Sequence, residues 1–326
     1  MYVTETAYAA GGSMGSAVPI EGKIQTVTIN QNNSLIRTAA LGEGRNEVFV
    51  GWGNYDCSFS IDYEIAGFDF LQYAFGAKAG SGSTSTPYYL EEATFRAYTG
   101  SGLRSFRMQV NAKDYTGGTD SVDTIIGCIL NSISINCSLG QNVKCSVEGL
   151  AQKVTASTTG SGSYTASTTK PWIYALGDFN WNGSDVGRIQ SITVNVNNNF
   201  DPNLGREIGS RFVQEMEPGL RKYDWTAVVK MTSAVHNALV LDFQGGAELS
   251  TGGTGEPSFK EIVLALSEGS STGHRNAQIK LSDCAINDMS KPINISENII
   301  EVTMNGTAKK GTEDTTNRPI KWWVST

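Results

Sequence analysis

The sequence predicts a mainly β protein made of two tandem copies of one domain, each a β-sandwich or barrel with one short flanking helix. Three observations predict this fold. The chain of 326 residues contains an internal repeat, its apolar residues alternate in strand fashion with the same phase in both copies, and Gly, Ser, Thr and Asn are abundant while charged residues make up 17%. Such a composition is typical of β-rich proteins with many turns.

The internal repeat consists of three blocks that recur in the same order. Most differences between the first pair of blocks are conservative, which indicates a duplication. The matching blocks are Gly22 to Asn33 with Gly187 to Asn198, Tyr55-Asp56 with Tyr223-Asp224, and Val143 to Gly149 with Ile300 to Gly306.

Strand signals lie inside these blocks. From Tyr55 to Tyr63, apolar residues alternate with Asp and Ser, which predicts a half-buried strand. The segment from Tyr223 to Val229 alternates in the same phase. A slip of one residue would invert every side chain, so the shared phase predicts a shared fold.

Each copy also carries one candidate helix between its second and third blocks, at Ala66 to Ala77 and at Ser233 to Gln244. Apolar residues recur there at three-residue steps, Ser233 is a plausible N-cap, and Gly76 and Gly245 are plausible terminators. The predicted organisation is an N-terminal arm at 1–21, domain one at 22–154, a Ser/Thr/Gly linker at 155–170, domain two at 171–311 and a C-terminal arm at 312–326.

Charge and hydropathy exclude several classes of protein. The net charge of −7, from 25 basic and 32 acidic residues, argues against a surface that binds nucleic acid by neutralising phosphates. No segment approaches the ~18 apolar residues of a membrane span, and the start lacks a basic and apolar leader. We therefore expect that the protein is synthesised in the cytoplasm and does not associate with a membrane. The five cysteines form no metal motif, so buried free thiols are expected.

The chain offers little material for catalysis or metal binding. Only two histidines occur, and no phosphate-binding loop or dinucleotide fingerprint is present. We therefore predict no catalytic, cofactor or metal site, and no enzyme. One ambiguity stays open at Asp178 to Gly183, which copies the start of a calcium loop, although position twelve is Ile189 instead of Glu. The alternative there is a plain Asx/Gly-rich turn.

Each copy also has a long inter-strand loop early in its sequence, at Arg37 to Gly53 and at Asp201 to Gly219, and a Gly-rich loop tip, at Gly80 to Ser85 and at Gly269 to Gly273. Together with the repeat cores, this pattern resembles the tail tube proteins of tailed bacteriophages and related archaeal viruses, in a duplicated two-domain form. The resemblance covers residues 22 to 154 and 171 to 311. It implies tube-fold domains standing side by side in rings of six, which a two-domain chain would reach with three copies.

The resemblance further implies that the rings stack into a conduit for viral DNA, which passes without specific binding. Partners would be further copies of the chain and other tail proteins, and the location would be the tail of the virion after synthesis in the host cytoplasm. Polar strand faces are candidates for the lumen or the exterior, and any solvated strand face looks the same. These faces carry Thr26, Thr28, Ser58, Ser60, Ser191, Thr193 and Thr226, whereas Val228 departs from the pattern.

Two other classes remain open. A tail-tip or baseplate component, a capsid decoration or a fibre domain also uses duplicated β-sandwiches without catalysis. A carbohydrate-active β-protein, with a carboxylate pair and the Trp-rich segment Trp172 to Trp181, is a third reading.

Two sets of residues are expected to serve assembly. The long loops Arg37 to Gly53 and Asp201 to Gly219 are predicted to dock on the next ring, where charged pairs would fix angular register. The apolar cluster of the C-terminal arm is predicted to anchor in a partner, with packing on its own domain as the alternative. The loop residues are Glu43, Arg45, Glu47, Trp52, Arg206, Glu207, Arg211 and Glu215; the arm residues are Ile320, Trp322 and Trp323.

Overall fold

The structure is a computed structural model that describes residues 1–38, 49–93, 103–112, 120–160, 167–185, 189–230, 239, 243, 259–290, 301–310 and 319–326. Copy one contains β1 (Tyr2–Thr4), η1 (Met14–Ser16), β2 (Gly22–Thr38), β3 (Phe49–Ile65), η2 (Asp69–Leu71), α1 (Gln72–Phe75), β4 (Lys78–Ala79), β5 (Tyr88–Leu90), β6 (Phe106–Ala112), β7 (Ser121–Ser138), β8 (Lys144–Ala151) and β9 (Lys153–Ser157). Copy two contains η3 (Tyr174–Leu176), β10 (Gly177–Trp181), β11 (Ser184–Asp185), β12 (Ile189–Asn197), β13 (Lys222–Lys230), β14 (Lys260–Ser267), β15 (Arg275–Ser290), β16 (Glu301–Lys310) and β17 (Ile320–Val324).

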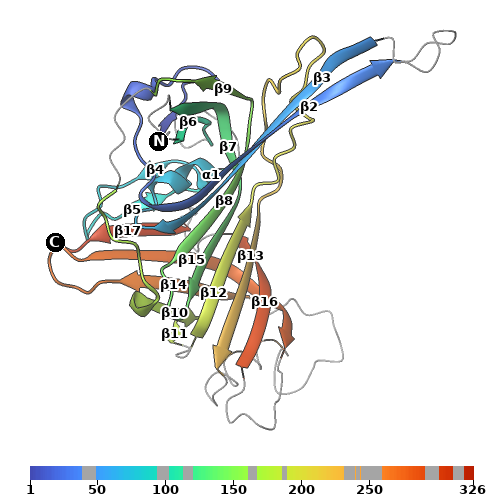
Figure 1. The fold of residues 1–326 in the computed structure, drawn as a ribbon. Coiled ribbons are helices and arrows are strands. Elements are labelled where there is room, and N and C mark those ends of the chain that lie inside the picture. Colours follow the sequence, from blue (N-terminus) through green and yellow to red (C-terminus); the bar gives the residue numbers. More distant parts are fainter. Residues whose placement is uncertain are drawn as a thin grey trace, which may run out of the picture.

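The two copies share one antiparallel sheet, which is the main feature of the fold (Figure 1). Its long strands pair in the order β2–β3–β8–β7 in copy one and β12–β13–β16–β15 in copy two. Strand β7 also pairs with β12, so the two sets of four join without a break. We call this eight-stranded unit the main sheet. The predicted mainly β class is confirmed, and the two domains are merged along a common sheet.

Strands β7 and β15 each bend from the main sheet into a second layer. The first half of β7 pairs with β6 and β9, and the first half of β15 pairs with β14 and β17. The two bends fall at Gly127 (φ 69°) and Asp283 (φ 52°), which are matching positions of the two copies. A backbone with positive φ is most easily adopted by Gly and tolerated by Asp, so both residues suit the bend.

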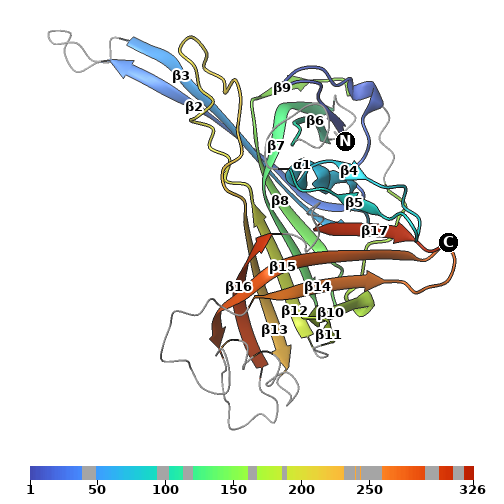
Figure 2. The ribbon, with the colours of Figure 1, turned by 180° about the vertical axis from the view of Figure 1, so that it is seen from behind.

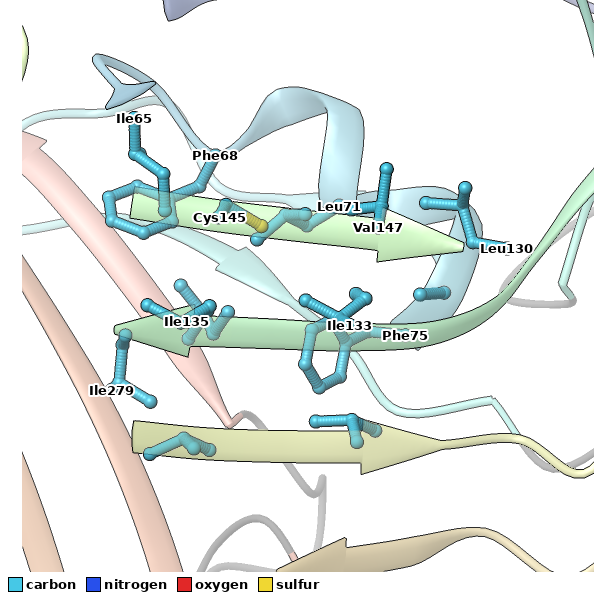
Figure 3. Packing of buried hydrophobic residues seen from close by; sticks show 14 of the residues in the cluster. Ile65, Phe68, Leu71, Phe75, Leu130, Ile133, Ile135, Cys145, Val147 and Ile279 are labelled. Carbon is cyan, nitrogen blue, oxygen red and sulfur yellow. The ribbon is translucent and has the colours of Figure 1, made fainter. Parts of the chain in front are cut away.

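The hydrophobic core lies between the two layers. One cluster of buried side chains runs through both copies, from Tyr2 in β1 to Ile320 in β17. Figure 3 shows part of this cluster, where Leu71 and Phe75 of the helical segment lie over Ile133 on β7 and Val147 on β8. The continuous core means that neither copy buries its apolar face independently of the other.

The first predicted helix is confirmed as the short segment formed by η2 and α1, within the expected range from Ala66 to Ala77. The second, Ser233 to Gln244, falls outside the described residues except for Leu239 and Phe243.

The alignment of Tyr55 with Tyr223 is wrong by two residues. Phe59 pairs with Gly149 on β8, and Trp225 pairs with Gly306 on β16. Phe59 therefore matches Trp225. Strand patterns repeat every two residues, so a shift of two keeps every side chain on its predicted face and cannot be detected from alternation.

Two glycines confirm the corrected match and show a packing constraint. A Cβ on Gly149 would lie 2.2 Å from the Phe59 ring and 2.5 Å from the carbonyl oxygen of Ile129. A Cβ on Gly306 would lie 2.5 Å from the Trp225 ring and 2.2 Å from a carbonyl oxygen on β15. In each copy an aromatic ring lies directly over a glycine of the next strand, and no larger residue fits.

The segments predicted as arms and linker also contain strands. Strand β1 pairs with β6 as β10 pairs with β14, and Tyr2 is buried against Phe70 and Phe106. The structure thus places a counterpart of β10 within residues 1–21. Strand β9 covers the first residues of the predicted linker. Within the described ranges, no helix is long and apolar enough to cross a membrane.

We expect Gly306→Ala to lower the free energy of unfolding by about 1–3 kcal/mol or more, because the new methyl group overpacks against backbone and the Trp225 ring. The measurement is chemical unfolding of the purified protein. Gly15→Ala is the matched control, since its Cβ would meet only the Ser13 hydroxyl, at 3.5 Å. Equal stability of the two variants would contradict the packing constraint.

Candidate assembly surfaces

The junction between the copies is a continuous β-ladder. Strands β7 and β12 pair over seven residues, from Ser132 opposite Asn197 to Ser138 opposite Ser191. The apolar side chains of both strands point into the core and are buried, whereas their Ser, Thr and Asn side chains occupy the other face. Asn136 Nδ2 donates a hydrogen bond to Thr193 Oγ1 across this polar face, at 2.8 Å. Backbone pairing and core packing therefore join the copies together.

A buried charged cluster reinforces the junction. Arg221, just before β13, lies 3.0 Å from Glu92 Oε1 and donates hydrogen bonds to Asn198 Oδ1 at 2.7 Å and to the Ala74 carbonyl at 2.9 Å. Both side chains of the ion pair are about nine-tenths buried. Tyr223 also donates its hydroxyl hydrogen to Glu92. Copy two supplies the arginine and copy one supplies the carboxylate, so the cluster fixes one copy against the other.

The described residues of both predicted docking loops lie at the same end of the main sheet. Figures 1 and 2 show the β2–β3 hairpin projecting beyond the sheet, with the segment between β12 and β13 running beside its base. We call this the projecting end. The segment 201–219 doubles back on itself, since the Gln214 amide donates to the Gly205 carbonyl at 2.8 Å.

Two arginines among the predicted loop residues make contacts within the chain. Arg206 pairs with Asp56 on β3. The Arg211 guanidinium lies 5.2 Å from the centre of the Trp52 ring and donates to Asn33 on β2. These arginines therefore attach the loop of copy two to the hairpin of copy one.

The other predicted loop residues either lie outside the described residues or are exposed. Glu43, Arg45 and Glu47 lie outside the described residues. Glu207 and Glu215 are exposed, and Trp52 keeps 67% of its surface exposed despite its contact with Arg211.

Sequence reasoning missed the apolar character of the projecting end. Single exposed apolar residues are ordinary, but a group of them on one projection marks an interaction site. The available signal was the pair of apolar dipeptides Leu35-Ile36 and Phe49-Val50, which interrupt polar runs. The exposed apolar residues of this end are Leu35, Ile36, Phe49, Val50, Trp52, Leu204, Ile208 and Leu220.

The C-terminal residues Ile320, Trp322 and Trp323 lie in β17, which pairs with β15 and with β5. Ile320 is fully buried, and the Trp322 ring packs between Phe68 and Tyr88 at centroid distances of 5.8 and 5.5 Å. Trp323 is only partly buried. Strand β17 therefore pairs with copy two through β15, whereas the Trp322 ring packs on Phe68 and Tyr88 of copy one. The expected anchoring of these residues in a partner stays a prediction.

The segment Asp178 to Gly183 forms a β-hairpin. Strands β10 and β11 pair on either side of Asn182 (φ 50°) and Gly183 (φ 77°), the residue pair favoured in two-residue turns with positive φ. Asn180 Nδ2 donates to Asp178 Oδ2 at 3.0 Å. The turn alternative therefore accounts for this motif.

The polar face of the main sheet is acidic. The predicted residues Thr28, Ser60 and Thr193 lie on this face, opposite the core. Among the described residues, its carboxylates outnumber its lysines. The carboxylates are Asp56, Asp62, Glu64, Glu148, Asp224, Asp288 and Glu301, and the lysines are Lys23, Lys144, Lys222, Lys230 and Lys309.

The two outer strands of the main sheet each lack a neighbour on one side within the described ranges. Strand β2 pairs only with β3, whereas its counterpart β12 pairs with both β13 and β7. The second half of β15 pairs only with β16, whereas the matching half of β7 pairs with β8 and β12. A cavity of about 420 Å³, lined partly by Ile24 and Val27, lies beside β2.

A family model described as phage tail tube protein matches residues 1–308, which is nearly the whole chain. The chain belongs to this family. A search of curated proteins gives no match. The tail tube family is a family of structural proteins.

We expect Arg221→Met to lower the free energy of unfolding by about 3–5 kcal/mol, because it leaves the buried Glu92 carboxylate unpaired. The double variant Arg221→Met/Glu92→Gln removes both charges and should recover part of that loss. Chemical unfolding measures both. If the double variant were as unstable as the sum of the two single variants, the ion pair would not be the cause.

Proposed function

We propose that three copies of this tail tube protein close into a ring of six domains, and that such rings stack into a tube that conducts the viral genome. Family membership supports the tube role. The ring is supported by one observation. Inside the chain β7 pairs with β12, whereas the matching edges of β15 and β2, on the two sides of the main sheet, have no neighbouring strand among the described residues.

A head-to-tail arrangement follows from those edges. The open edge of β15 and the open edge of β2 are different surfaces, so each chain would bind one neighbour on each side. Heterologous contacts of this kind close into a ring when the rotation between subunits allows it. Because each chain carries two domains, a ring of six equivalent domain positions requires three chains.

The polar face of the main sheet would line the lumen. The apolar face is covered by the second layer, so the polar face is the one available to a channel. Duplex DNA carries one phosphate charge per ~1.7 Å of axis, and a basic lining would hold it through counterion release. An acidic surface of Ser, Thr, Asn and carboxylates lets DNA pass without binding.

The projecting end would dock on the next ring. Its exposed apolar residues other than Leu35 supply contact area, while Glu207 and Glu215, together with Glu43, Arg45 and Glu47 of the hairpin loop, would set the angular register. Partly buried Trp323 is the remaining candidate of the C-terminal arm for a contact with another ring.

Native mass spectrometry of assembled material, combined with cryo-electron microscopy, tests the proposal. We expect a unit of three chains and threefold symmetry with a pseudo-sixfold appearance. Six chains in a ring, or a stable monomer under all assembly conditions, would overturn it. A single ring that never stacks would instead favour a tail-tip component.

We expect tubes of wild-type protein not to retain duplex DNA, and tubes of Asp62→Lys/Asp224→Lys to retain it in a salt-sensitive way, because these positions lie on the polar face. The measurement is co-sedimentation of DNA with tubes at increasing salt. Asp62→Asn/Asp224→Asn is the control that removes charge without reversing it. Tight binding by the wild type would contradict a lumen of this kind.

A further inference from the structure

We infer that the edge of β15 in one chain pairs antiparallel with the edge of β2 in a second copy, with Asp288 opposite Asn32, Met289 opposite Gln31 and Ser290 opposite Asn30. The inference rests on the proposed ring and adds the strands and the register of its interchain seam.

A shared bulge aligns β15 with β7. Leu130 pairs with Gly149 and Ser132 with Glu148, so Asn131 is the extra residue. Ile286 pairs with Gly306 and Asp288 with Asn305, so Asn287 is the extra residue of β15. A β-bulge fixes the register of a strand pair, and a bulge at the same place in both copies marks matching residues. The segment Asp288 to Ser290 therefore matches Ser132 to Ser134.

A second shared bulge aligns β2 with β12. The ladder between β2 and β3 skips Gln25, and the ladder between β12 and β13 skips Gln190. With these two residues matched, Asn30, Gln31 and Asn32 correspond to Asn195, Val196 and Asn197.

The internal junction then supplies the register. In that junction Ser132 lies opposite Asn197, Ile133 opposite Val196 and Ser134 opposite Asn195. Replacing each residue by its counterpart in the other copy gives the interchain pairs stated above. The same replacement puts polar side chains on the polar face of both seams.

The exposure of Leu35 supports a second copy as the occupant. Its counterpart by the same alignment is Phe200, which is buried in a cluster that includes Ala93 and Leu103 of copy one. Leu35 keeps 43% of its surface exposed. The apolar side chain that copy two buries on copy one is thus exposed in copy one, as expected if its partner surface belongs to the next chain.

Disulfide trapping tests the register. The double variant Asn32→Cys/Asp288→Cys should form interchain disulfides, because facing Cα atoms in an antiparallel pair lie about 4.5–5.5 Å apart, within the range of a disulfide. Thr28→Cys/Asp288→Cys is the matched control, since it moves one cysteine four residues, about 13 Å, along β2. Each single variant reports background.

The native cysteines should not interfere. All five are buried, and burial raises the pKa of the Cys145 and Cys284 thiols to about 12, which keeps them protonated at neutral pH.

We expect covalent dimers and closed trimers from the 32/288 pair on non-reducing gels, at least tenfold more than from the 28/288 pair. Native mass measured on the same samples separates the two proposals. Trimers without disulfides at 32/288, or with equal trapping at 28/288, would overturn the register and leave the ring intact. Disulfides at 32/288 that extend to open chains longer than three would support the register and overturn closure. No association at all would overturn both.

Discussion

The pairing of β7 with β12 is the interaction on which the rest of the structure depends. It turns two copies of a domain into one sheet, and the sheet in turn creates a single core that neither copy encloses alone. Because a strand presents alternate side chains to opposite faces, this one register also decides that all Ser, Thr and Asn residues of the junction share a face. A continuous polar surface across both copies is the direct result.

The seam is held by more than backbone hydrogen bonds. Arg221, Glu92 and Asn198 form a buried cluster whose main hydrogen-bonding groups find partners, and such a cluster specifies one orientation at a cost in desolvation. Phe59 matches Trp225, so Tyr55 occupies the position of Arg221 in copy one. The arginine is therefore specific to the seam inside the chain, and an interchain seam of the same strand geometry would depend on edge pairing and apolar contacts without it.

The fold class, the duplication and the face of each strand could be predicted from the sequence because all three depend on local periodicity. The two-residue error between Tyr55 and Tyr223 arose because period-two patterns repeat at every second residue. The strand pairings that place matching glycines under Phe59 and Trp225 resolve it. The contacts of the candidate assembly surfaces were harder to predict from the sequence. Arg206 and Arg211 are charged loop residues, but partners 150 or more residues away decide whether they face solvent or Asp56 and Asn33. The contribution of β1 was hidden because a three-residue strand carries too little pattern.

The duplication also changes how a six-domain ring would assemble and along which seams it would dissociate. Three of its six seams form while single chains fold, at no cost in translational entropy. Assembly would then require two associations and one ring closure, where an unduplicated protein requires five associations and one closure. Seams of two kinds would alternate around the circumference, one permanently tethered and supported by Arg221, the other reversible. Under load, such a tube would open first along three lines spaced at one-third of a turn, and each line would separate whole chains without unfolding any of them.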